Sequence, residues 1–460
     1  MFGATLSRWT MSYFAAALIF LAIGEMMMVL GFGYPVSAIE APETLALVHT
    51  IALGWLSLLM AGALLQFVPV LVGRPLSLPS LALPALVLLV VGITSLVLGF
   101  ASLAGADSLS PLLLPFGATV TIVGFGLLVI VFAVTLWQAR PLPLPARFVA
   151  VGLGSLVATI ALGGTYAFVL VGLSDAQAAI DLTLEGLSLH AALGLGGWLS
   201  FTTMGVSYRL LTMFMLSPER ERQSSRIVWA LGAAALGIVA CIVPMILSGS
   251  AGRFVLLLVA ALAGVIAIGI YMVDIVRIYR GRKRKRIELN SRAGIGAFAA
   301  LTVATVFFVA LVVSGQIERG VGSLVYLVTF GWLTGMGLAQ LYKIVPFITW
   351  LECYGPLLGR MPTPRVQDLV VEVRAAFWFR VYYLTVIIAS TALYLDTALL
   401  FRASSFGQLI AVNALLWEFV ATRRLSNVPS NLQLPSGFAR PHLFFPSFQS
   451  RRWHERGRAR

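Results

Sequence analysis

The chain has 460 residues, of which 59% are hydrophobic and only 11% are charged. Its mean hydropathy of +0.95 lies far above that of soluble globular proteins and excludes a soluble enzyme. The formal net charge of +14 would suggest nucleic-acid binding if the basic residues formed one face, but they fall in alternate loops between apolar runs. We therefore expect one helical membrane domain and no nucleic-acid partner.

Apolar runs of about twenty residues recur along the chain, and this is the length that a helix needs to cross a bilayer. The first run has no small-residue cleavage site, so we expect it to be retained as a membrane span. The twelve predicted spans cover residues 11–34, 44–72, 80–103, 111–138, 147–173, 184–216, 226–249, 254–278, 293–315, 321–350, 375–397 and 404–422.

The basic residues are distributed unequally between the two sets of loops. The N-terminus, the even-numbered connections and the C-terminal tail hold 26 of the 32 Lys and Arg residues, whereas the odd connections hold three. By the positive-inside rule, both termini are expected in the cytoplasm of a bacterial-type inner membrane. The basic run at 282–286 is interpreted as a topology determinant, with a specific anionic-lipid site as the alternative.

Two domains are expected: a membrane domain over residues 1–424 and a basic cytoplasmic tail over residues 425–460 with little fixed structure. His442 and His454 fall in this tail and are expected to be exposed to solvent. Cys241 and Cys353 are too far apart in the sequence for a disulfide framework or a thiolate cluster, and we assign them no redox role.

A Gly-Trp pair recurs in the second, sixth and tenth predicted spans, at Trp55, Trp198 and Trp332. Two positions after each Trp stands a hydroxyl residue, and eleven positions after it stands a polar or basic residue. This spacing predicts a unit of four helices used three times. The basic members of the second set, Arg209 and Lys343, are expected to reach headgroups at the membrane surface.

His49 and His190 are the two histidines that fall inside predicted spans, and both precede the Trp of their repeat by a similar distance. Neutral imidazole is a strong nitrogen ligand for haem iron or copper, so the pair are candidate cofactor and metal ligands. Each histidine could instead bond a carbonyl or hydroxyl of a neighbouring helix.

Glu25 is the clearest buried carboxylate of the predicted membrane domain, and it is followed by three methionines. Such a group could bond a histidine, carry protons or stay protonated, and the thioethers of Met26 and Met28 could support a copper or haem site. Asp274 is expected to pair with Arg277, three residues further on.

The segments HTIALGWLSLLMAGALLQFVP and HAALGLGGWLSFTTMGVSYRLL, in a chain of twelve spans, resemble the haem-copper oxidase catalytic subunit superfamily (cytochrome c oxidase subunit I-like). The closest likeness is to small divergent members, including the haem-copper membrane proteins linked to nitric oxide response. The resemblance implies an all-α integral membrane fold, a twelve-helix bundle with a pseudo-three-fold repeat. It also implies that His49 matches the low-spin haem ligand of span two, and His190 the copper ligand of span six.

The chain departs from this family in its ligand set. Family members also use histidines in spans seven and ten, and the predicted spans at 226–249 and 321–350 contain none. The resemblance therefore implies a divergent haem- or copper-binding protein in electron transfer or in nitric oxide or oxygen handling, with electron-donor partners such as cytochrome subunits, rather than full oxygen reduction. Two alternatives stay open: a permease that kept the scaffold without a cofactor, and an accessory subunit whose partners complete a site.

Overall fold

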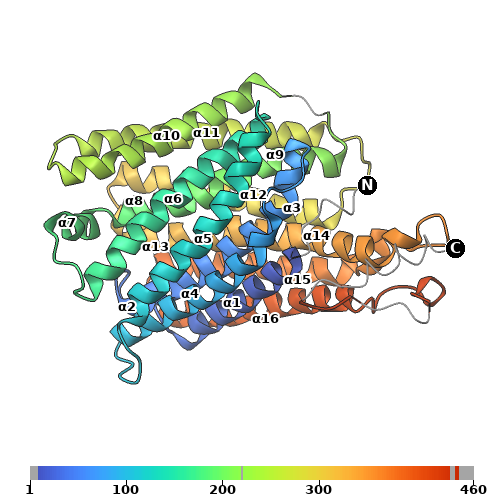
Figure 1. Cartoon of the computed structure of the whole chain (residues 1–460), viewed down its shortest axis with the longest axis horizontal. Helices are drawn as coiled ribbons and strands as arrows, with labels where there is room; N and C mark the ends of the chain where they lie inside the picture. Colours follow the sequence, from blue (N-terminus) through green and yellow to red (C-terminus); the bar gives the residue numbers. More distant parts are fainter. Residues whose placement is uncertain (1–8, 219–220, 436–440, 445–460) are drawn as a thin grey trace.

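The computed structural model describes residues 9–218, 221–435 and 441–444, and these residues form helices and loops without a β-strand. Eleven helices are long and apolar enough to cross a membrane, and a bent pair supplies a twelfth span. The helices lie side by side as a bundle (Figure 1). The chain is therefore a multi-pass membrane protein, as its composition predicts.

Each predicted span corresponds to a helix or to a continuous series of helical segments. The first group of four comprises α1 (Thr10–Leu30), the series α2 (Pro42–His49), η2 (Thr50–Ser57) and α3 (Leu58–Val72), then α4 (Ala82–Leu103) and α5 (Leu113–Gln138). The second comprises α6 (Leu144–Leu170), the series α7 (Gln177–Glu185), α8 (Leu187–Ala191), η4 (Ala192–Phe201) and α9 (Thr202–Met215), then α10 (Gln223–Leu247) and α11 (Arg253–Arg280). The third comprises α12 (Leu289–Ser314), the series α13 (Ile317–Tyr326), η5 (Leu327–Thr334) and α14 (Gly335–Cys353), then α15 (Glu372–Tyr394) and α16 (Ala398–Arg423).

The sixth span differs from a straight helix, because α7 is bent by 64° from the rest of the series. The break falls at Gly186, between the two segments. None of the residues of α7 is buried. Little packing energy therefore favours a straight continuation of α7 into the span that follows. The span itself runs from Leu187 to Met215, close to its predicted bounds.

The predicted repeat has a structural counterpart in the middle of the bundle. The Gly-Trp pairs all lie in π-helical segments, namely η2, η4 and η5, and these three segments contact one another. Trp55 and Trp332 are fully buried there, and Trp198 almost so. The second, sixth and tenth spans therefore meet at one centre.

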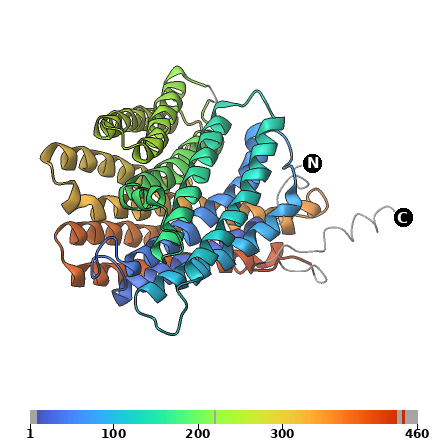
Figure 2. The same ribbon diagram turned by 60° about the vertical axis from the view of Figure 1, so that its left-hand side comes forward.

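The hairpin of α10 and α11 lies at the edge of the bundle in both views (Figures 1 and 2). These two spans are the least buried of the chain, so most of their apolar surface is available to lipid.

At the end of the bundle that carries the basic loops, residues after α16 fold back on the helices. Leu425 and Val428 are buried against Tyr354 and Leu369. The carbonyl of His442 accepts hydrogen bonds from the buried Arg423, while the rest of His442 is exposed as expected. His454 lies outside the described residues.

Candidate metal-binding site

His49 and His190 meet in one cavity between the first and second repeats. His49 ends α2 and His190 lies in α8, so each stands just before a π-helical segment of the central cluster. The centroids of the two imidazole rings are 6.3 Å apart. The structure therefore brings together the two histidines that the sequence singled out.

Each histidine is held through its Nδ1 atom by a backbone carbonyl. The Nδ1 of His49 is 2.7 Å from the carbonyl oxygen of Leu45, and that of His190 is 3.1 Å from the carbonyl oxygen of Thr159. A carbonyl can only accept a hydrogen bond, so Nδ1 carries the proton in each ring. The lone pair then lies on Nε2, the arrangement in which histidine ligates metals.

The cavity that receives the two rings has a volume of about 340 Å³ and lies among α2, α4, α5, α6 and α8. Phe100 stacks on His49 with ring centroids 5.0 Å apart, and Tyr166 lies 5.6 Å from His190. The buried hydroxyl of Tyr166 has no hydrogen-bond partner among residues 9–218, 221–435 and 441–444. The site thus offers two nitrogen donors and a phenol in largely apolar surroundings.

Sequence reasoning missed Phe100, Thr159 and Tyr166 as residues of this site. They lie on the third and fifth spans, outside any motif, and only the packing of α4 and α6 against the second and sixth spans places them at this site.

The arrangement of ligands in haem-copper oxidases does not fit these residues. No residue of the tenth span lines the cavity, and none of the seventh span does. The second and tenth spans instead pack closely, because the indole nitrogen of Trp55 donates to Thr334 at 2.9 Å. Tyr326 precedes Trp332 by six residues, as His49 precedes Trp55, so a tyrosine stands in the tenth span where the second has its histidine. We therefore derive no oxygen-reducing centre from this site.

Besides the two imidazoles, the side chains lining the cavity that could donate an electron pair include the phenol of Tyr166 and the carboxylate of the exposed Glu40. Within the described part of the chain, no group of three or more His, Cys, Asp or Glu residues could hold a metal ion. An ion held by the two imidazoles would complete its ligands from these oxygens, from a macrocycle or from water.

The three proposed supporting residues do not line this cavity. Met28 is buried in the main apolar core and Met26 is exposed on the outside of α1. Glu25 is fully buried, but its carboxylate accepts a hydrogen bond from Gln408 of α16, away from the histidines.

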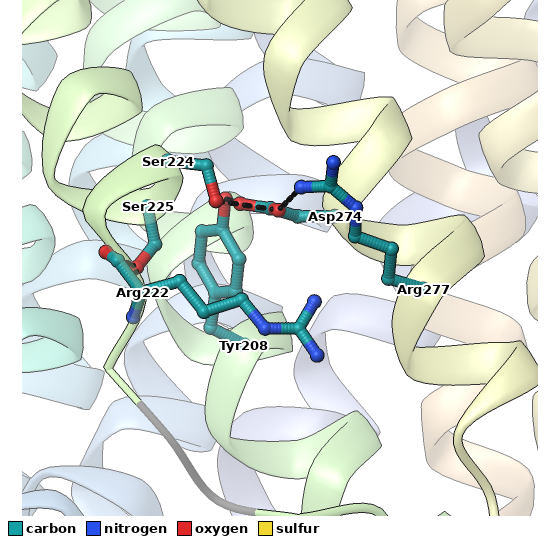
Figure 3. A network of polar contacts seen from close by, with 6 residues as sticks. All are labelled: Tyr208, Arg222, Ser224, Ser225, Asp274 and Arg277. Atoms are coloured by element: carbon teal, nitrogen blue, oxygen red, sulfur yellow. Dashed lines mark hydrogen bonds and ion pairs between the residues drawn. The ribbon is translucent and has the colours of Figure 1, made fainter.

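A separate polar network surrounds Asp274 near the end of α11 (Figure 3). Arg277 donates to this carboxylate at 3.3 Å, which confirms the predicted pair. Tyr208 and Ser224 also donate to it, at 3.1 and 2.7 Å, so α9, α10 and α11 are joined here. The buried charge is compensated locally, and the network ties one end of three spans together.

The two basic residues of the repeat have different surroundings. The ammonium group of Lys343 makes an ion pair with the carboxylate of Glu288 at 2.5 Å. Its charge is therefore compensated by a side chain of the protein, where the sequence predicts a lipid headgroup. Arg209 lines a cavity of about 260 Å³ beside the Asp274 network.

No protein-family model and no curated protein matches the sequence. Among solved structures, the fold is similar to that of a haem-copper terminal oxidase dimer studied by cryo-EM, with a TM-score of 0.62. The match covers 95% of this chain and 85% of that chain, at 12% sequence identity. The chain therefore has an all-helical membrane fold of the haem-copper oxidase subunit I type.

Proposed function

We propose that this protein binds one metal centre, a haem iron or a copper ion, between His49 and His190. The observation that carries the proposal is that both imidazoles enter one cavity with Nδ1 bonded to a carbonyl and Nε2 left with its lone pair. A single hydrogen bond of this kind is common for a histidine between helices. Two in one cavity are better explained by a shared ligand.

The spacing of the rings supports a shared ion. Two imidazoles that hold one ion must lie close together, because metal–nitrogen bonds are about 2.0–2.1 Å long. The ring centroids of His49 and His190 are 6.3 Å apart, so the two imidazoles would be close enough to hold one ion.

Electron transfer, or the binding of nitric oxide or oxygen, fits this site better than full oxygen reduction. When bound, a haem or copper centre would supply a redox couple, and a copper ion held by the two imidazoles would also keep coordination positions for a diatomic gas. The phenol of Tyr166 lies beside His190, where it can donate a hydrogen bond to such a gas. The histidines of spans seven and ten, which the second metal centre of the oxidases requires, are missing from this sequence.

The proposal includes a location and a partner. The basic loops favour a bacterial-type inner membrane with both termini in the cytoplasm, and the segment from residue 425 onward is then a cytoplasmic extension. The sequence has no Cys-x-x-Cys-His motif for a covalently attached haem, so electrons would have to come from a separate cytochrome or other donor subunit.

The test is the visible absorption spectrum of the detergent-purified protein, oxidised and reduced, with copper assayed in the same samples and haem and copper supplied during expression. We expect His49→Ala and His190→Ala each to abolish a haem Soret band or stoichiometric copper. His442→Ala is the matched control, because this histidine is exposed to solvent and does not line the cavity.

The two metals give different results in this experiment. A Soret band that carbon monoxide does not shift would identify a haem held by both histidines, whereas a shift would show that one of them is not a ligand of the iron. Copper without a band would identify the ion alone. Wild-type protein with neither would overturn the proposal and favour the cofactor-free permease or accessory subunit.

A further inference from the structure

A second buried polar site lies where the third repeat meets the first, around Glu25 of α1. Gln408 of α16 donates its amide hydrogen to Oε1 of Glu25 at 2.6 Å. The hydroxyl of Tyr326, in α13, donates to the amide oxygen of Gln408 at 2.5 Å. All three side chains are buried, Glu25 and Gln408 completely. The chain of donors therefore ends on the carboxyl group of Glu25.

The second carboxyl oxygen of Glu25 has no hydrogen-bond partner in the described parts of the chain. No ion pair of Glu25 is found there either. An isolated carboxylate in an apolar interior is strongly disfavoured relative to the neutral acid. Since Oε1 accepts from Gln408, Oε2 is the oxygen that holds the proton.

The buried Glu418 of α16 provides an internal contrast. Arg374 binds this carboxylate through two nitrogens, the second at 2.9 Å. The guanidinium compensates the charge of Glu418, which is only 2% exposed, through two hydrogen bonds. Two carboxyl groups with similar burial thus differ in their partners.

A polar face of α16 connects Glu25 with the end of the bundle opposite the basic loops. Arg402 is exposed there and donates to the carbonyl of Val29 at 3.0 Å. Ser405 follows three residues later and Gln408 three residues after that, so the three side chains lie on one face of the helix, toward α1. The hydroxyl of Ser405 is fully buried and, like Oε2 of Glu25, has no partner among the described residues.

This polar face ends below Gln408. The next residues of α16 on the buried side are Ala411, Val412 and Leu415, all with no exposed surface. Gln408 and Glu418 are ten residues apart in α16, which corresponds to about 15 Å along a helix. The polar face of α16 thus lies between Gln408 and the end of the bundle opposite the basic loops, and buried apolar side chains of α16 follow it toward the basic end.

We propose that Glu25 is a proton-binding site that exchanges its proton with the end of the bundle opposite the basic loops, through Ser405 and Arg402. Oε2 and the hydroxyl of Ser405 are not hydrogen-bonded to each other, so a water molecule between them would carry the proton from Oε2 to Ser405. From there the proton would pass to water at the exposed Arg402, and the reverse movement would reload the acid. Tyr326, Tyr382 of α15 and Arg402 are the titratable or charged groups facing this site. His49, on the adjacent second span, faces the other cavity.

The experiment is infrared difference spectroscopy of the reconstituted protein on transfer between H₂O and D₂O, and between neutral and alkaline buffer. We expect a C=O stretching band of a protonated carboxyl group at neutral pH that disappears in Glu25→Gln. The same band should persist in Glu418→Gln, because Arg374 compensates the charge of the Glu418 carboxylate with two hydrogen bonds. A band unchanged in Glu25→Gln would overturn the assignment.

The route is tested by the rate at which this band shifts in D₂O. Ser405→Ala should slow the shift at least tenfold, whereas Ser404→Ala should not, because the hydroxyl of Ser404 donates to the carbonyl of Phe401 within its own helix. Equal rates in both variants would overturn the route. A band that responds to sodium ions at constant pH would overturn the proton as the ligand. Melting temperatures of the variants identify any that fail to fold, and none of these readings depends on a metal at the histidine pair.

Discussion

At the scale of single residues, the feature that decides the chemistry is the hydrogen bond made by each histidine to a carbonyl. It fixes the tautomer and the ring orientation before any ligand binds. His49 bonds within its own helix, whereas His190 reaches across to α6, so the second ring depends on how α6 and α8 pack.

Gly163 of α6 is the residue that makes room for the ring of His190. A Cβ atom added there would lie 2.9 Å from Cε1 of His190, and the ring would have to turn away. We expect Gly163→Ala to weaken metal or haem binding by about 10- to 100-fold, the size of effect seen when support of a metal ligand is lost.

Gly154→Ala is the control for this prediction. Gly154 lies on the same helix, α6, and a Cβ atom added there would have no neighbouring atom within 4 Å. Binding titrations of the two purified variants give the comparison. Equal affinities would show that the position of the His190 ring is unimportant.

At the scale of elements, the three π-helical segments form a partly closed ring of hydrogen bonds. Trp198 of η4 donates to Ser57 of η2 at 3.0 Å, and Trp55 of η2 donates to Thr334 at the end of η5. The repeat predicts a third bond from Trp332 to Ser200, but the indole nitrogen of Trp332 has no partner in the described residues. Ser200 instead lines an apolar cavity of about 310 Å³ between the second and third repeats. The three interfaces thus differ although the repeat is shared.

We expect Trp55→Phe and Trp198→Phe each to destabilise the protein by about 1–2 kcal/mol, because each leaves a buried hydroxyl without its donor. Trp332→Phe removes the same ring atoms without breaking such a bond and should cost less. Thermal unfolding in one detergent, followed by circular dichroism, ranks the three variants. A loss for Trp332→Phe as large as for the others would contradict a role for these hydrogen bonds.

At the scale of the whole molecule, ion pairs gather at the end of the bundle that carries the basic loops. Arg374 pairs with Glu418, Lys343 with Glu288, and Arg423 with Glu352. These pairs join helices that are distant in sequence, such as α14 with α16. The Lys and Arg residues are concentrated in the loops at one end of the bundle. We therefore expect the protein to insert into a membrane in a single orientation.

Reporter insertions test that orientation. Alkaline phosphatase inserted after Asp107 should be active, and a fluorescent protein inserted after Lys285 should fluoresce, if the basic loops are cytoplasmic. The same reporters exchanged between the two sites provide the control and should both be silent. The opposite pattern would reverse the assignment of both ends.

The sequence by itself determined the membrane class, the spans and the repeat. The reason is that span length and loop charge are local properties, imposed by the thickness of the bilayer and readable along the chain. It also singled out His49 and His190, because an imidazole inside an apolar run is costly without a role.

Only the tertiary structure decided which residues share a site. The second span has several faces, and packing alone turned His49 toward α4 and α6 rather than toward the tenth span. The same packing separated Glu25 from the histidines and placed it against Gln408, 383 residues away in the chain. Contacts of such separation depend on how helix surfaces fit one another, and spacing along a single sequence does not record that fit.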